Sequence, residues 1–180
     1  MSSLAMAQSD EAMAERLLGP EWKQLARRAG IVFAGTVLTS GSQIPITNPT
    51  ITAQTRTDRT VPAIELSFRV DRAIVGVKPG QLLTVREWVG ASSLHRAMRS
   101  GEHILIFLYS PSRLGFTSPV GGSRGQIALD ASGKNVMEQN PLAPWDLGTD
   151  MSRLSARDRA GLASITVAQL ERAIRAARGE

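Results

Sequence analysis

Hydrophobic and polar residues alternate with a period of two over much of the middle of the chain. From Ile64 to Asp71, apolar side chains alternate with polar ones, which predicts a strand with one buried face. Residues 31–38 and 103–109 are apolar almost throughout, which is typical of strands buried on both faces. Further strands are predicted at residues 82–89, 125–130 and 134–137. The pattern therefore predicts a mainly β domain.

Turn-forming residues separate these strands. Pro79 and Gly80 occupy the second and third positions of a predicted type II turn, which would join two antiparallel strands. Residues 40–60 are rich in Thr and Pro and contain few core-forming residues, so they predict either a long loop or an irregular hairpin. Residues 110–125 combine Gly, Ser and Pro with a few apolar residues and predict a second loop region.

Both ends of the chain show a helical period. Residues 9–28 predict helix, with Ser9 as N-cap and a break at Gly19 and Pro20. Near the C-terminus, residues 155–158 and 166–169 resemble capping boxes. The helix after the second box places apolar residues on one face and charged residues on the other. The apolar face consists of Val167, Leu170, Ile174 and Ala177, and the charged face of Glu171, Arg172, Arg175 and Arg178.

Short antiparallel strands between terminal helices predict a five- to six-stranded, OB-like antiparallel barrel. We expect an N-terminal helix and a C-terminal amphipathic helix to pack on it. The predicted core comprises Ile31, Phe33, Val37, Leu66, Phe68, Val70, Val85, Leu105 and Phe107, with Tyr109 also inside. The predicted divisions are a disordered start or signal-peptide remnant at 1–8, a helical segment at 9–29, the barrel at 30–139, and a connector with C-terminal helices at 140–180.

Composition narrows the possible chemistry. The chain has 180 residues, no Cys, two His and a formal net charge of +5. Disulfides, Cys-ligated zinc and thiol nucleophiles are therefore excluded, and no apolar run reaches the ~18 residues of a membrane span. We expect a globular protein, without a membrane span, that acts as a monomer and needs no metal or cofactor.

Four segments carry a resemblance to a known family. Residues 28–37 resemble the opening strand of the netrin-like domains, the OB-fold superfamily of the tissue inhibitors of metalloproteinases, and its bacterial branch. Phe68-Arg-Val70 with Val75-Gly76, and then residues 101–109, follow in the order seen in the bacterial relatives. The turn at residues 118–122 is similar to turns of secreted members. The resemblance covers residues 28–137 and implies an OB fold.

The resemblance also bears on location and on inhibition. The animal inhibitors chelate a protease zinc ion through an N-terminal Cys, which this chain lacks, so only the fold is carried over. Ala5-Met6-Ala7 fits the small-residue pattern of a signal-peptide cleavage site. Together with the resemblance, this pattern favours an exported protein, periplasmic or secreted. The alternative is an irregular start rich in small residues.

One motif suggests catalysis. Residues 121–125 match the G-x-S-x-G nucleophile motif around Ser123. That motif requires a preceding strand and a His downstream, whereas His95 and His103 both lie upstream. We therefore interpret it as a Gly-rich turn and expect no enzyme.

Two functional hypotheses remain. The first is an exported, non-enzymatic OB-fold module that binds a protein or peptide through its loops. The alternative is a single-stranded nucleic-acid-binding OB-fold protein, which the small number of available aromatic residues disfavours. The candidate binding residues are Arg113, Phe116, Thr117, Ser118 and Arg124 in one loop and Arg56 and Arg59 in the other.

Overall fold

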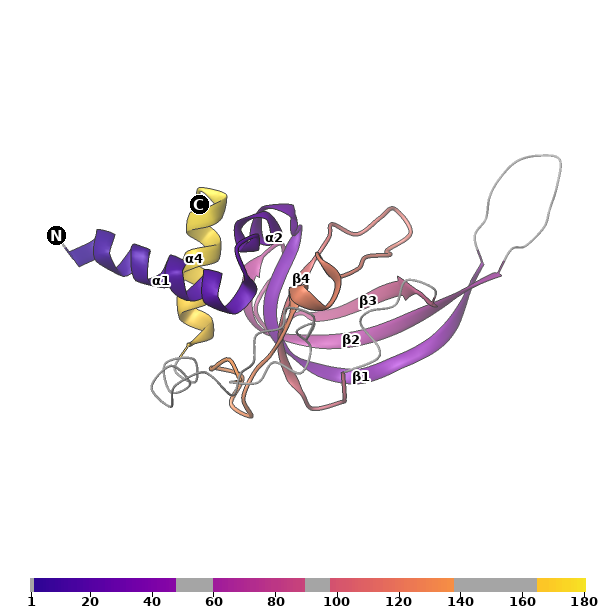
Figure 1. Cartoon of the computed structure of the whole chain (residues 1–180). Helices are drawn as coiled ribbons and strands as arrows, with labels where there is room; N and C mark the ends of the chain where they lie inside the picture. The colour runs from indigo at the N-terminus through magenta and orange to yellow at the C-terminus, as the bar shows by residue number, and fades with distance from the viewer. Residues whose placement is uncertain (1, 48–59, 90–97, 138–164) are drawn as a thin grey trace, which may run out of the picture.

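The strands form one antiparallel sheet. The computed structural model describes residues 2–47, 60–89, 98–137 and 165–180. The strands are β1 (Ile31–Thr47), β2 (Thr60–Val75), β3 (Leu82–Trp88), β4 (His103–Leu108) and β5 (Gln126–Ala128). Their order in the sheet is β3-β2-β1-β4-β5, and all neighbours are antiparallel (Figure 1). The mainly β, antiparallel fold is confirmed; in the part of the chain that the structure describes, the sheet is open.

β1 and β2 form a long hairpin that extends away from the helices (Figure 1). Their ladder runs from Val32 opposite Val75 to Thr47 opposite Thr60. For residues 40–47 the predicted loop is wrong, and the alternative of an irregular hairpin is right. Register shifts between Val37 and Ser42 interrupt the regular alternation on which a strand prediction depends. Residues 48–59 lie outside the described residues.

The connection from β2 to β3 is the predicted tight turn. Gly80 has a φ of +76°, and the N–H of Gln81 donates to the carbonyl of Lys78 at 3.2 Å. Only a residue without Cβ adopts such a φ readily, so the Pro-Gly pair determines this turn locally. The antiparallel hairpin expected from this pair is confirmed.

One face of the sheet encloses the first of two cores. Phe33 and Phe68 meet edge to face, with ring centroids 5.6 Å apart. Around them lie Ile31, Val37, Leu66, Val70, Val85, Ile104 and Ile106, all buried. Leu105 and Phe107 are buried on the opposite face, because successive residues of β4 point to opposite sides. Every core position that the sequence analysis names is buried, with the exception of Tyr109. The predicted core is therefore confirmed at all the other positions.

Three helices cover that opposite face: α1 (Ser2–Leu18), α2 (Trp22–Arg28) and α4 (Val167–Arg178). The second core joins Trp22 and Ile174 of the helices to Val32 and Phe107 of the sheet. Figure 1 shows the helices gathered at one end of the sheet, which leaves the far end of the β1–β2 hairpin uncovered by them. Because α1 begins at Ser2, Ser9 lies inside a helix and its predicted role as N-cap is wrong.

α4 begins with the predicted capping box. The Thr166 hydroxyl accepts from the Gln169 N–H at 3.2 Å, and the Gln169 side chain accepts from the Thr166 N–H at 2.8 Å. Val167, Leu170 and Ile174 are buried, so the amphipathic helix packs as expected. The first predicted capping box, at residues 155–158, lies outside the described residues.

Arginines connect the helices to one another. Arg172 donates to both carboxylate oxygens of Asp10, at 2.7 and 3.1 Å. Arg27 donates to the Ala177 carbonyl at 2.9 Å, while Arg178 donates to two carbonyls at the end of α2. Each of these two helices thus receives a cation at its negative C-terminal end from the other. The expectation that the charged face of α4 points outward is therefore wrong for Arg178.

Residues 116–119 contact β3, at one end of the strand order, and β4, which is second from the other end. Phe116 forms a single parallel bridge with Arg86 of β3, and Pro119 a single antiparallel bridge with Leu108 of β4. The Thr117 N–H donates to the Arg86 carbonyl at 2.9 Å. These isolated bridges hold the loop after β4 against the outer edge of β3.

Candidate functional site

The predicted loop residue Phe116 is not a free surface residue. It is only 6% exposed, and its ring stacks on Trp88 with centroids 4.1 Å apart and planes 2° from parallel. Trp88 remains 36% exposed at the end of β3. The prediction of a solvent-facing Phe116 is wrong, because the loop folds back and the Trp ring covers it.

Thr117 and Ser118 anchor the loop instead of projecting from it. The Thr117 hydroxyl donates to the Tyr109 carbonyl at 2.7 Å, and the residue is buried. The Ser118 carbonyl accepts from the Tyr109 N–H at 3.0 Å. Tyr109 itself is 39% exposed, so its predicted place in the core is wrong. Its N–H and carbonyl bind the returning loop at the point where β4 ends, and the ring is left outside.

Of the four predicted binding arginines, the structure describes Arg113 and Arg124. Arg113 is exposed in the loop. Arg124 lies on the short 3-10 helix η2 (Gly122–Gly125), beside α2, where its guanidinium is 3.9 Å from the Glu21 carboxylate. Arg56 and Arg59 lie outside the described residues. A single basic surface built from these side chains is therefore not found in the described part of the chain.

The Ser123 motif has no catalytic surroundings in the described residues. Ser123 lies on η2, between a turn and β5, and no hydrogen bond links its hydroxyl to a described His or acid. Gly121 and Gly122 have positive φ, as expected of a Gly-rich turn. His95 lies outside the described residues.

Along the outer edge of β3, some backbone groups have no hydrogen-bond partner among the described residues. Because the Arg86 carbonyl points away from β2 to meet Thr117, alternation places the N–H and C=O groups of Thr84 and Leu82 on the same outer side. Neither residue forms an outward backbone hydrogen bond with any described residue. Leu82 is also 71% exposed. We call the outward groups of Leu82 and Thr84, with the Trp88–Phe116 pair, the β3-edge surface.

The sequence analysis missed most of this surface. The sequence predicts Leu82 and Trp88 as part of a strand, and nothing local in a strand sequence indicates whether it is central or at an edge. The loop prediction did point to Phe116, which the fold brings to the same edge.

A polar network lies on the face of the sheet opposite the core that contains Phe33 and Phe68. The Thr36 hydroxyl donates to the Asp71 carboxylate at 2.6 Å and lies 3.2 Å from His103 Nδ1. Arg69 donates to Asp71 at 2.9 Å and to Thr36 at 3.2 Å. Because Thr36 gives its only proton to Asp71, His103 must donate from Nδ1. The network thereby joins β1, β2 and β4, and the His103 side chain at the start of β4 is partly buried.

This network does not have the geometry of a catalytic triad. In a triad, the nucleophile and the acid bind opposite nitrogens of the imidazole. Here Thr36 and Asp71 both face Nδ1, the carboxylate at 3.6 Å. His103 therefore cannot take the Thr36 proton while Asp71 orients its other nitrogen, and the network acts as a brace between strands.

The brace perturbs Asp71. Burial disfavours the carboxylate, but hydrogen bonds from Thr36 and Arg69, and the charges of Arg69 and His103, outweigh it and lower the pKa of Asp71 below 3.8. A depressed folded pKa contributes stability that is present above the unfolded pKa and is lost as the pH falls through the folded one.

We therefore expect Asp71→Asn to lower the free energy of unfolding at pH 7 by up to about 1 kcal/mol, since the pair is partly exposed. Denaturant unfolding from pH 7 down to pH values below the folded pKa measures the effect, and the difference from wild type should shrink below pH 3.8. Glu15→Gln, which changes an exposed carboxylate, is the control. A difference that is independent of pH would contradict the assignment.

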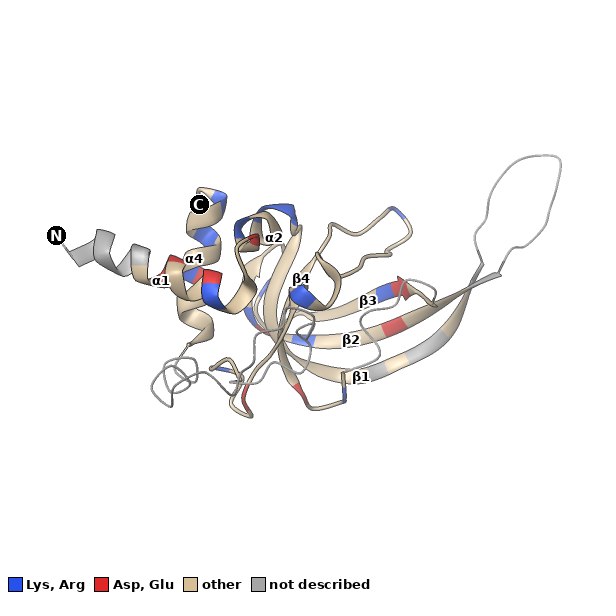
Figure 2. Cartoon of the chain, viewed as in Figure 1, with Lys and Arg blue, Asp and Glu red and all other residues tan. Residues whose placement is uncertain are grey.

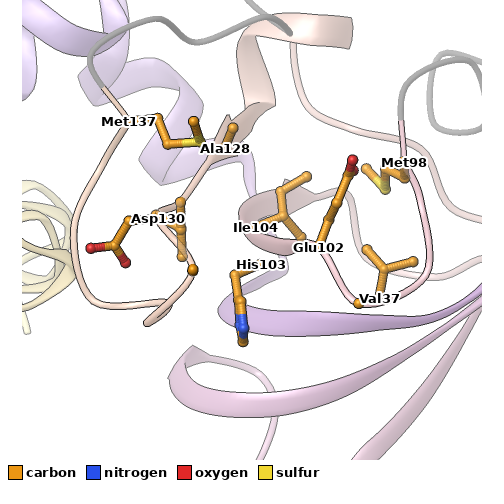
Figure 3. Close-up of a pocket in the computed structure, with 11 residues that line it drawn as sticks. Val37, Met98, Glu102, His103, Ile104, Ala128, Asp130 and Met137 are labelled. Carbon is orange, nitrogen blue, oxygen red and sulfur yellow. The ribbon is translucent and has the colours of Figure 1, made fainter.

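A pocket of about 370 Å³ lies beside the first residues of β4. Its apolar lining comprises Val37, Met98, Ile104, Ala128, Leu129 and Met137. Figure 3 shows Ala128, Asp130 and Met137 on one side of it and Val37, Met98 and Glu102 on the other. We call it the β4 pocket.

Within the described residues, no group of three or more His, Asp or Glu side chains could hold a metal ion. Among the described helices, none is long and apolar enough to cross a membrane. The chain matches no known family model, no curated protein and no solved structure.

Proposed function

We propose that this protein is a non-enzymatic binding module that captures an extended segment of a protein or peptide along the outer edge of β3. The observation that carries the proposal is the row of outward N–H and C=O groups at Leu82 and Thr84. A strand edge of this kind is a template for one further strand, and added peptide strands are a common mode of recognition.

The side chains around this edge supply the contacts that backbone bonds lack. Trp88 gives a flat apolar surface, held in place from behind by Phe116. Leu82 offers a second apolar contact at the other end of the strand. Aromatic anchors at a rigid site lose little side-chain entropy on binding, so Trp88 would contribute most of the side-chain affinity.

The fold family of this domain is also part of the proposal. We infer an OB-like barrel of the netrin-like type, in which the bridges of Phe116 to Arg86 and of Pro119 to Leu108 represent the closing strand. The order of motifs over residues 28–137 supports this inference. Export to the periplasm or the medium, and a monomeric state, follow as part of the proposal.

Nucleic-acid binding is the second candidate, favoured by the exposed Trp88 beside Arg86. The charges near it argue against this role. Arg86 pairs with Glu65 at 2.9 Å, and Arg69 pairs with Asp71 at 2.9 Å. Basic and acidic residues are interspersed over β2 and β3 and do not form a continuous basic surface (Figure 2). Binding to single-stranded DNA that weakens steeply with salt would favour this candidate.

The test of peptide binding is a substitution in the edge itself. Peptides would be selected from a random 12-residue display library on the full chain, and binding of the best one measured. Because the Thr84 N–H points away from β2, Thr84→Pro removes an outward donor without breaking the β2–β3 ladder. We expect this variant to weaken binding about ten-fold or more, and Thr84→Ala, which keeps the N–H, to leave it unchanged.

Trp88→Ala should weaken the same peptide by a similar factor of about ten or more. Leu38→Ala, which truncates an exposed apolar residue on β1, is its matched control. Failure to enrich any peptide, or selected peptides that bind Thr84→Pro as well as wild type, would overturn the proposal.

A further inference from the structure

We propose that the β4 pocket binds a small apolar molecule that carries a protonated amine. The inference is independent of the β3-edge surface, because the pocket and that surface share no residue. Its volume of about 370 Å³ falls within the range of about 300–1,000 Å³ that is usual for small-molecule sites.

The apolar part of the ligand is set by the lining. Ile104 and Val37 are buried core residues that form one wall, and Met98 is also almost fully buried. Met137 is largely exposed at the opposite side. Thioether side chains are flexible and polarisable, so two of them let the pocket adapt to alkyl groups of different shape.

The charge of the ligand is set by the polar groups. Glu102 and Asp130 line the pocket, whereas no Lys or Arg is among its lining residues in the described part of the chain. The Asp130 carboxylate accepts hydrogen bonds from Ser132, Asn135 and the backbone of Lys134, which lower its pKa well below the ordinary value. Its charge therefore persists at any ordinary pH.

The remaining titratable group of the lining is His103. His103 lines the pocket, but its Nδ1 lies toward Thr36 and Asp71, on the face of the sheet opposite the core that contains Phe33 and Phe68. A Cβ at Gly133, where φ is +66°, would lie 2.9 Å from that nitrogen, so the 130–135 turn packs closely on the ring. Because His103 faces the Asp71 carboxylate at 3.6 Å, the carboxylates of Glu102 and Asp130 determine the sign of the local potential. They would attract an ammonium group and repel a carboxylate.

The experiment compares three probes with the same alkyl chain: octylamine, octan-1-ol and octanoate. Each is titrated into the full ¹⁵N-labelled chain while backbone amide shifts are followed. We expect shifts at Gly101, Ala128 and Met137, and octylamine to bind about ten-fold more tightly than octanoate at low salt. Equal affinities for the two ions, or shifts elsewhere in the chain, would overturn the proposal.

Two kinds of variant separate the charge from the cavity. Glu102→Gln should reduce the preference for octylamine over octanoate, while Glu15→Gln should not change it. Ala128→Leu should fill the cavity and weaken binding of all three probes. If Ala128→Leu does not fold, Ala131→Trp at the exposed rim serves the same purpose. Undiminished octylamine binding in a folded, filled variant would show that the pocket is not the site.

Discussion

Phe68→Ala is expected to lower the free energy of unfolding by about 3–5 kcal/mol, because it removes a ring from a core that cannot collapse around the space. Phe68 is fully buried and packs edge to face against Phe33. Its neighbours Leu66 and Val70 lie on the same strand face, in a ladder held on both sides by β1 and β3. Urea unfolding followed by circular dichroism measures the change.

Leu82→Ala is the matched control for this prediction. It truncates an apolar side chain on the adjacent strand that is largely exposed, and should change the free energy of unfolding by no more than about 0.5 kcal/mol. A loss below about 1.5 kcal/mol for Phe68→Ala would indicate that this face of the sheet is loosely packed. Equal losses for the two variants would contradict the division into a buried and an exposed face.

The sequence predicts the cores well because burial follows alternation within one strand. Leu66, Phe68 and Val70 are spaced by two residues, and a strand that buries one of them on a face buries all three. The same reasoning works for Leu170 and Ile174 at helical spacing on α4. These predictions need only local periodicity, which a single sequence contains.

The candidate site depends on contacts between segments that are far apart in the sequence. Hydrophobic periodicity within one segment cannot predict such contacts. Phe116 and Trp88 stack although 28 positions separate them in the sequence, and Arg86 meets Thr117 through the backbone alone. Any residue except proline could donate the N–H at position 117. The loop composition therefore predicted that the region matters, and not which side chains it would bury. The placement of Tyr109 failed for the same reason, since the apolar run continues past the last position that the sheet covers.

The length of β1 failed for a different reason. Residues 40–47 contain Ser, Gly and Pro, which are unfavourable in strands, yet they pair with β2 as far as Thr47. The register shifts before Ser42 absorb the irregular positions, and pairing with β2 outweighs weak local preference. The sequence analysis leaves a long loop and a hairpin as alternatives, because no local pattern in these residues distinguishes the two.

The second large effect on the free energy of unfolding is expected for Ile174→Asp, a substitution in the helical layer. Ile174 is fully buried in the core shared by α4, α2 and the sheet. A carboxylate at this position loses its hydration and the apolar contacts together, so we expect a loss of more than about 4 kcal/mol at pH 7. Thermal and urea unfolding of the full chain measure it. Loss of the helical signal with an intact sheet signal would show that α4 detaches while the sheet persists.

Ala176→Asp is the matched control, because Ala176 is exposed two residues further along the same helix. It should cost no more than about 1 kcal/mol, the effect of an acid near a helix C-terminus. The pH dependence separates burial from simple helix propensity. Burial would raise the folded pKa of the new Asp at 174, so the folded state would bind the proton more tightly than the unfolded one. The loss relative to wild type should therefore diminish as the pH falls from 7 toward about 4 in Ile174→Asp. A loss that stays constant over this range would mean that the carboxylate reaches water, and that α4 does not pack against the sheet as described.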